Sequence, residues 1–540
     1  MIMMKHTRKR LLLPLMASLA MVGAASAQTE VRVGDPTAGV QAADQIDVSV
    51  TWTAANVYNL VDQIFVMPGA TLTIEAGTRI ASTPTDNGSG SLAVTRGGKI
   101  MVMGTAEAPV VMTSTNDDGT WREVANEWGN LTMMGNGLIS ASHFDGQPIV
   151  VNGRENTKIP DGLNMKQMEG MVAGFPGDPK VLYGGMDDED DSGIINYLSI
   201  RYGGRVVGLG NELNGLSLGA IGRATDIQYV EVMNNVDDGI EIWGGTVNLK
   251  NVSVWNVGDD SIDVDQGWRG KIQNALIVQG YSLDASQGSG VGDNAFETDG
   301  AEDSDAQPVT TATIYNATVI GQPLAGDGGT TWRDGARVQY RNSIFMDLGE
   351  KLVRPDGDDG DGAQGYGFNG TMTFEQCWTT PHTASFDPAT TVNAAPGAVP
   401  GTFNHPETLY QAQVDGNLCE ITGSIMFQNF AEDAYIDAEA LGVLDPANNN
   451  LRDPASPPVQ LVVREAPVMK GGLDMARVSM LDPRAANDAL QLLPGALPAP
   501  DDGFFTPATY VGAFDGCTNW LAGWSAADQF GMLVTTPLCP

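Results

Sequence analysis

Acidic residues recur at a fixed interval in the middle of this chain, in a pattern that could bind a cation or donate a proton. The pair Asp237-Asp238 returns 22 positions later as Asp259-Asp260. The residues that follow also correspond, since GIEIWGG after the first pair matches SIDVDQG after the second. A third and looser copy, DNAFETDG, begins at Asp293. The chain therefore carries three successive copies of one acidic unit.

The length and pattern of these copies predict how they are positioned. A repeat this short cannot bury its own apolar residues, so the copies must stack on one another. Short alternating runs broken by Gly, Asn and Asp indicate strands rather than helices. We therefore expect the copies to be rungs of a right-handed parallel β-helix. Because side chains alternate along a strand, Ile240 and Ile242 should face the interior and Glu241 the outside.

The outward carboxylates are the best candidates for a metal site. On successive rungs they would lie about 4.8 Å apart, the spacing of paired strands, and could not all stay ionised without compensation. Calcium is the natural compensator, since it is a hard cation that takes about six to eight oxygen ligands. Two alternatives stay open: the Asp pairs only make solvated turns, or some carboxyls are protonated general acids. The predicted metal ligands are Asp237, Asp238, Asp259, Asp260, Asp263, Asp265 and Asp293, and Glu241, Glu297 and Asp299 belong to the same acidic column.

The same stretch holds candidate catalytic and ligand-binding residues. Paired carboxylates could hydrolyse a glycosidic bond, and a basic side chain could abstract a proton in a calcium-assisted elimination. Arginine seldom deprotonates, so lysine is the easier base; alternatively, the basic residues only balance the acidic column. The candidates for catalysis are Asp237, Asp238, Asp259, Asp260, Arg269 and Lys271, and the candidates for ligand contact are Arg205 and two tryptophans beside glycines that could stack on a sugar, Trp243 and Trp268.

The rest of the chain divides around this stretch. Residues 1–27 have a basic start, an apolar run and an A-x-A cleavage site, which predict a signal peptide. Residues 28–50 are expected to form a leader or cap, and residues 51–355 the coil, with an insertion at about 116–180 where the repeat is lost. Residues 356–540 hold all four cysteines and are expected to cap the coil. Of three possible pairings we favour the local ones, Cys377–Cys419 and Cys517–Cys539.

Composition limits the partners of the protein. The formal net charge of −37 argues against nucleic acid and anionic membrane surfaces. No segment after residue 27 is long and apolar enough to suggest a transmembrane helix. We therefore expect an exported protein, extracellular or at the cell surface, whose partner is a polysaccharide or a cell-surface glycan.

Several passages resemble a widespread set of secreted bacterial right-handed β-helix proteins. They are PGATLTIEAGTRI, TRGGKIMVMGTAEAPVVMTS, GIEIWGGTVNLKNVSVWNVGDDSIDVDQGWRGKIQ and YVGAFDGCTNWLAGW. The resemblance implies the architecture that pectate lyases, polygalacturonases and phage tailspikes share, which is analogy of fold and not of activity. From the acidic column we expect a calcium-binding, glycan-associated protein with a binding or structural role. The alternative is a calcium-dependent polysaccharide lyase or a glycoside hydrolase.

Overall fold

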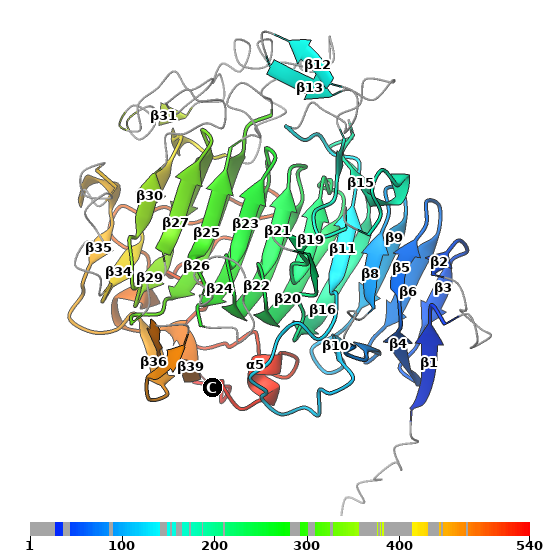
Figure 1. Ribbon diagram of the computed structural model, residues 1–540. Helices are drawn as coiled ribbons and strands as arrows, with labels where there is room; N and C mark the ends of the chain where they lie inside the picture. Colours follow the sequence, from blue (N-terminus) through cyan, green and yellow to red (C-terminus); the bar gives the residue numbers. More distant parts are fainter. Residues whose placement is uncertain are drawn as a thin grey trace, which may run out of the picture.

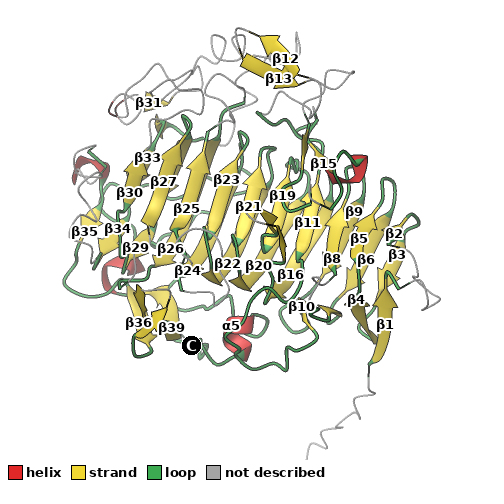
Figure 2. Ribbon diagram, in the orientation of Figure 1, coloured by secondary structure: helices red, strands yellow, loops and turns green. Residues whose placement is uncertain are grey.

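The chain forms a parallel β-helix, as the sequence predicts. The computed structural model describes residues 28–35, 44–85, 90–140, 148–151, 154–157, 165–171, 174–185, 187–208, 211–280, 292–300, 308–324, 328–355, 375, 379, 381–382, 413–429, 442–443, 446–470 and 473–539. Among these residues, one parallel sheet has 17 strands and another has 10. Figure 1 shows the strands stacked along one axis, and Figure 2 shows that the helical segments are short and lie outside this stack.

Both large sheets consist of short strands in parallel register. The smaller sheet contains, in spatial order, β2 (Gln45–Ile46), β5 (Gln63–Val66), β8 (Ser91–Val94), β11 (Leu131–Met134), β19 (Leu216–Gly219), β21 (Ile240–Trp243), β23 (Ile262–Asp265), β25 (Asn294–Asp299), β27 (Gly328–Arg333) and β30 (Val353–Pro355). The larger sheet contains β1 (Thr29–Val33), β3 (Val50–Trp52), β4 (Asn56–Leu60), β6 (Thr71–Glu75), β7 (Arg79–Ser82), β9 (Lys99–Met103), β10 (Val110–Ser114), β16 (Gly193–Arg201), β20 (Asp226–Asn235), β22 (Asn248–Val257), β24 (Lys271–Val278), β26 (Thr311–Ile320), β28 (Arg337–Arg341), β29 (Ile344–Met346), β33 (Glu420–Thr422), β34 (Ile425–Phe427) and β35 (Leu451–Arg452).

The remaining elements are small and lie outside the two large sheets. Antiparallel pairs are formed by β12 (Pro148–Val151) with β13 (Arg154–Thr157), β14 (Lys166–Gln167) with β15 (Leu182–Tyr183), β17 (Val206–Gly208) with β18 (Asn211–Glu212), β31 (Pro381–His382) with β32 (Gly416–Asn417), β36 (Val459–Arg464) with β39 (Val478–Ala485), and β37 (Val468–Lys470) with β38 (Leu473–Met475). The helical segments are η1 (Pro179–Val181), η3 (Pro446–Asn448), η4 (Asn487–Leu490) and α5 (Ala526–Gln529).

A central rung of the coil consists of a long strand in the larger sheet and a short strand in the smaller one. β20 pairs with β22 so that Ile227 lies opposite Leu249, and β21 pairs with β23 so that Ile240 lies opposite Ile262. These pairings are the 22-residue repeat that the sequence predicts. The third copy joins as β25, where Phe296 lies opposite Ile262.

The long strands contain residues with left-handed backbone, and one such position recurs from rung to rung. In β22, β24 and β26 this residue is Asn251, Asn274 and Asn316, with φ of 56°, 61° and 58°. Asparagine tolerates this conformation better than most residues do. Nδ2 of Asn274 also donates a hydrogen bond to Oδ1 of Asn251, 2.8 Å away, so the amides link one rung to the next.

The predicted alternation of side chains holds on the acidic rungs. Ile240, Ile242 and Ile262 are fully buried in the main apolar core of the coil. Glu241 and Asp263 lie between these inward residues along the strands, opposite each other across the pair. The acidic side chains therefore stand together on the outer face of the smaller sheet.

The coil occupies part of the range 116–180 that the sequence analysis assigns to an insertion. β11 lies in the smaller sheet between β8 and β19. All four of its residues are buried, so no alternation marks it as a strand. The excursion away from the coil begins after Met134, and its described part includes β14 and β15. Met134 of β11 and Met168 of the excursion belong to one buried apolar cluster, which explains why an apolar side chain stands on the outer face of β11.

The C-terminal region continues the coil and then returns along it, and its role as a cap stays a prediction. β33, β34 and β35 extend the larger sheet beyond residue 355. Residues 486–539, which we call the strap, then run back over the outer face of this sheet. The backbone N–H of Ala513 donates to Thr318 of β26, and that of Ala526 donates to Glu231 of β20. Strap and sheet bury a second apolar cluster between them.

One of the two predicted disulfides is present. Cys517 and Cys539 are bonded, with their Cα atoms 5.1 Å apart. Cys419 is buried in the coil, whereas Cys377 lies outside the described residues, so that pairing stays a prediction. In the part of the chain that is described, none of the helices is long and apolar enough to cross a membrane.

Candidate metal centre

An acidic groove lies on the outer face of the smaller sheet, over β21, β23 and β25. It has a volume of about 290 Å³, and nine carboxyl groups and one guanidinium line it. Most of these groups come from the three predicted copies of the acidic unit. The lining residues are Glu169, Asp237, Asp238, Glu241, Asp259, Asp260, Asp263, Asp293, Glu297 and Arg333.

One wall of the groove is a ladder of hydrogen bonds from rung to rung. Each side chain accepts the backbone N–H of the next member: Asn214 Oδ1 from Asp238 at 3.2 Å, Asp238 Oδ1 from Asp260 at 2.9 Å, and Asp260 Oδ1 from Asn294 at 2.6 Å. An amide oxygen performs this task at the first step, so the task needs no charge. The two middle members are nevertheless carboxylates, and they are only 6% and 5% exposed.

A second column of carboxyl groups stands beside the ladder. Equivalent positions on five rungs carry Ser217, Glu241, Asp263, Glu297 and Thr331. Carboxyl groups occupy the middle three rungs, and hydroxyl groups occupy both ends. The turns before the strands add three more carboxylates, which are partly exposed: Asp237, Asp259 and Asp293.

Three overlapping sets of carboxylates are close enough to share a cation. In each set the ligand atoms lie within 4.8 Å of one another. Oxygen ligands alone, several of them charged, suit Ca²⁺ better than a transition metal. The sets are Asp237 with Asp238 and Asp259, Asp238 with Glu241 and Asp263, and Asp259 with Asp260 and Asp293.

Burial and mutual repulsion oppose ionisation of these groups. Burial raises the pKa of Asp238, Glu241 and Asp260 well above the ordinary values, and neighbouring carboxylates raise each pKa further. The same two causes raise the pKa of Asp263 and of Glu297. Oδ1 of Asp263 is also buried without a hydrogen-bond partner. Such a set is stable at neutral pH only when protons or cations neutralise it.

Arg333 is the one cationic side chain among the residues that line the groove. Its Nε and Nη2 donate to the two carboxylate oxygens of Asp299, at 2.8 and 2.7 Å. Nη2 also contacts Glu297. The hydrogen bonds to Asp299 raise the pKa of Arg333 above its already high value. The guanidinium therefore compensates the third acidic rung, and the lining of the first two rungs contains no second cation.

The structure places the predicted basic residues outside the groove. Arg269 is 3% exposed, and its Nη2 donates to Asp188 at 2.8 Å. Lys271 belongs to the larger sheet, where Nζ donates to Asp502 of the strap at 2.6 Å. Arg205 is also absent from the lining. None of the three therefore lines the groove.

The two predicted sugar-stacking rings are buried, which contradicts that assignment. Trp268 is fully buried, and its Nε1 donates to the carbonyl oxygen of Val247 at 3.0 Å. Trp243 is 3% exposed and lies against Tyr183 of β15, with ring centroids 6.1 Å apart. The adjacent glycines suggest open turns, but the coil and the excursion cover both rings. Asp265, at the end of β23, is likewise not among the lining residues.

Sequence analysis misses two residues of the groove. Arg333 lies opposite Asp299 in the pairing of β25 with β27. Extension of the repeat by one more rung would have found it. Glu169 is exposed on the excursion, where no repeat predicts the position of a side chain.

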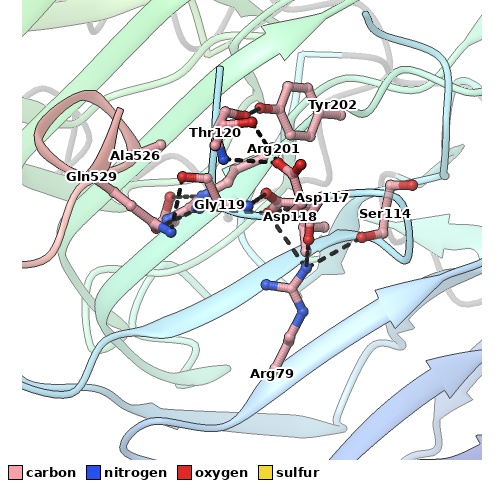
Figure 3. A network of polar contacts seen from close by, with 12 residues as sticks. Arg79, Ser114, Asp117, Asp118, Gly119, Thr120, Arg201, Tyr202, Ala526 and Gln529 are labelled. Carbon is pink, nitrogen blue, oxygen red and sulfur yellow. Dashed lines mark hydrogen bonds and ion pairs between the residues drawn. The ribbon is translucent and has the colours of Figure 1, made fainter. Parts of the chain in front are cut away.

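A second polar network, on the larger sheet, fastens the strap to the coil (Figure 3). Arg201 is 1% exposed, and its Nη1 donates to Oε1 of Gln529 in the strap at 2.8 Å. Arg79 donates to the carbonyl oxygen of Asp117 at 2.8 Å. Glu231, which is fully buried, accepts the N–H groups of two strap residues. The contacts within this network explain it as a structural clasp.

Fold and site together define a parallel β-helix whose outer face carries stacked carboxylates. The family model described as a pectate-lyase-like β-helix domain matches residues 44–158 and 165–392. The match covers more than half of the chain, so the chain belongs to the pectate-lyase-like β-helix family. Comparisons with curated proteins and with solved structures found no match.

Proposed function

We propose that the acidic groove binds calcium and that the bound calcium holds an anionic polysaccharide, in a protein that works outside the cell or on its surface. The family match supports carbohydrate interaction in general terms. The start of the sequence supports export, although residues 1–27 lie outside the described part of the chain. The residues that would hold calcium are the three carboxylate sets of the groove.

The ladder of Asn214, Asp238, Asp260 and Asn294 is the observation that carries this proposal. All four residues stand at one position of the coil, and amides occupy both ends. A carboxylate accepts the same N–H but adds a buried charge, which is costly unless something compensates it. On the first two rungs of the groove, the coil therefore holds a charged side chain at a position where the fold needs only a neutral hydrogen-bond acceptor. A bound cation accounts for this choice.

The proposed calcium gives the groove its affinity for an anionic glycan. Without a cation, nine carboxyl groups would repel the carboxylate of a uronate residue. Calcium takes about six to eight oxygen ligands, so a set of three carboxylates leaves positions for oxygen atoms of a sugar. Asp237, Asp259 and Asp293 are partly exposed, so ions held by them would be within reach of a polymer.

Calcium titration of an amide-ladder variant tests the metal site. Asp238→Asn with Asp260→Asn keeps the ladder acceptors and removes both charges. Each of the three carboxylate sets contains one of these residues, so we expect calorimetry to show calcium binding weakened at least tenfold. The control is Asp226→Asn with Asp488→Asn, which makes the same charge change at exposed positions outside the groove. Equal calcium binding by wild type and ladder variant would refute the site.

A binding assay with immobilised polymers tests the glycan. Polygalacturonate and alginate are the anionic probes, and dextran is the neutral one. We expect retention on an anionic polymer in calcium and release in a chelator. Calcium-independent retention, or equal retention on dextran, would contradict the bridging role while leaving the metal site intact.

A glycan-cleaving enzyme is the second candidate. The observation that favours it is the raised pKa of Glu241 and Asp263, because a carboxyl group that keeps its proton near neutral pH can serve as a general acid. Mass spectrometry of polymer incubated with the calcium-loaded protein distinguishes the outcomes. Unsaturated products indicate a lyase, water-added products indicate a hydrolase, and intact polymer leaves binding as the function.

A further inference from the structure

We propose that Arg333 is a built-in counter-cation that stands in for a metal ion at the third acidic rung and so limits how many calcium ions the groove takes. The proposal rests on the proposed function, since it concerns the stoichiometry of the same site. On this proposal Arg333 sets the number of bound ions and takes no part in a catalytic step.

Arg333 contacts two carboxylate groups, as a bound cation would. Both oxygens of Asp299 accept hydrogen bonds from the guanidinium, at 2.8 and 2.7 Å, and Glu297 contacts Nη2. Two carboxylates from one strand thus converge on one positive group. The Arg333 side chain is 41% exposed, whereas those of Glu297 and Asp299 are 11% and 12% exposed. The carboxylates are therefore the fixed part of this arrangement, and the guanidinium reaches them from the solvent side.

The position of Arg333 in the coil marks the end of the acidic groove. On its own strand, β27, Thr331 stands where the three preceding rungs carry carboxyl groups, and Gly328 lies opposite Asn294 of the ladder. The fourth rung thus adds no carboxylate and supplies a cation instead. The guanidinium forms ion pairs with Asp299 and Glu297, whereas Oδ1 of Asp263 has no hydrogen-bond partner.

Removal of the guanidinium would convert this end of the groove into a further cation site. Glu297 and Asp299 would lose their compensating charge, and Asp263 lies next to Glu297 across the strand pair. Glu297 and Asp299 already converge on the guanidinium, so its loss would leave two carboxylates directed at one position, with Asp263 on the neighbouring strand. We therefore expect Arg333→Gln to bind one more calcium ion per chain than the wild type does.

Calorimetric titration with CaCl₂ of the full chain tests this inference. Arg333→Lys keeps the charge and should bind as many ions as the wild type. Arg354→Gln is the matched control, since Arg354 lies on the next strand of the same sheet, pairs with Glu350 at 2.6 Å and is not among the residues that line the groove. The double variant Arg333→Gln with Glu297→Gln should lose the extra ion. Glu297→Gln alone should keep the wild-type number, and it remains informative if Arg333→Gln fails to fold.

The possible results separate this inference from the proposed function. A wild type that binds calcium, with a variant that binds one more ion, supports both. If Arg333→Gln binds the same number of calcium ions as the wild type, only more tightly, the charge of Arg333 acts at long range. That result would overturn this inference and leave the proposed function intact. A loss of ions in Glu297→Gln would also overturn it, because Glu297 would then be a calcium ligand beside Arg333. Absence of calcium binding in every variant would overturn the proposed function.

Discussion

Replacement of the two ladder aspartates by asparagine should stabilise the calcium-free protein at neutral pH. Asp238→Asn with Asp260→Asn retains an oxygen that can accept the N–H of the next rung, as Asn214 already does. What is lost is two buried charges among like charges. In most proteins the loss of two buried carboxylates with hydrogen-bond partners would destabilise the fold. The opposite sign is therefore a sharp test of the ladder argument.

The expected size follows from the geometry of the groove. Asp238 lies in a set whose carboxylate atoms are within 4.8 Å of one another. Two unit charges about 4.8 Å apart repel by roughly 0.9 kcal/mol in water and by roughly 3.5 kcal/mol at an effective dielectric constant of about 20. Asp237 and Asp259 are partly exposed, so the lower part of this range applies to them. We expect a gain of about 1–3 kcal/mol, or about 1–3 °C in Tm for a chain of this length, since the unfolding entropy is about 2.1 cal/mol/K per residue.

A thermal scan in chelator, repeated across pH, is the assay. The pKa of Asp238 and Asp260 is raised in the folded state. Such a group contributes stability below its unfolded pKa and loses it as the pH rises through the folded pKa. The wild type should therefore lose Tm from about pH 4 upwards, and the variant should lose less, so that the two curves meet in acid. Coinciding curves at every pH, or a variant that melts lower at pH 7, would refute the reasoning.

Three further predictions concern other parts of the molecule. Calcium affinity should rise with pH and calcium binding should release protons, because burial and repulsion keep the pKa of Glu241 and Asp263 high. A calcium affinity that calorimetry finds to be independent of pH would contradict this prediction. Glu231→Gln should loosen the strap by about 1–3 kcal/mol, because an NH₂ group replaces one of the two oxygens that accept strap N–H groups. Limited proteolysis within residues 517–539 should become faster, and an unchanged digest would count against the clasp. Trp268→Phe should cost at least about 1 kcal/mol, through the lost bond to Val247 and the cavity that the smaller ring leaves in the core, and it should leave glycan binding unchanged. A selective loss of binding at unchanged Tm would restore the sugar-contact assignment.

The sequence predicts those parts of the fold that repeat. The 22-residue interval places Ile240 opposite Ile262 and Glu241 opposite Asp263, as the structure has them. The looser third copy also falls in register, with Glu297 opposite Asp263. A coil makes such inference possible, because one rung fixes the backbone path of the next. The carboxylates that the three copies contribute to the groove could therefore be predicted from spacing, whereas Glu169 could not.

The parts that fail to repeat could not be predicted in this way. Trp243 is covered by Tyr183 of the excursion, which has no counterpart on other rungs. Nζ of Lys271 donates a hydrogen bond to Asp502 of the strap, 231 residues further along the chain. A short stretch of sequence gives no indication that a distant segment of the chain will cover one face of a sheet. The exposure of a side chain on the coil thus depends on segments whose course only the structure shows.

The repetition that builds the groove also limits its height. Every additional charged rung places a carboxylate about 4.8 Å from the previous one, so repulsion accumulates along the column while the benefit to the fold does not. Both columns return to neutral polar residues, the ladder at Asn294 and the neighbouring column at Thr331. Arg333 supplies a positive charge at the rung where the second column stops. Three charged rungs at this spacing span about 10 Å, so the polysaccharide site that we propose would contact a short stretch of polymer and would not extend along the whole coil.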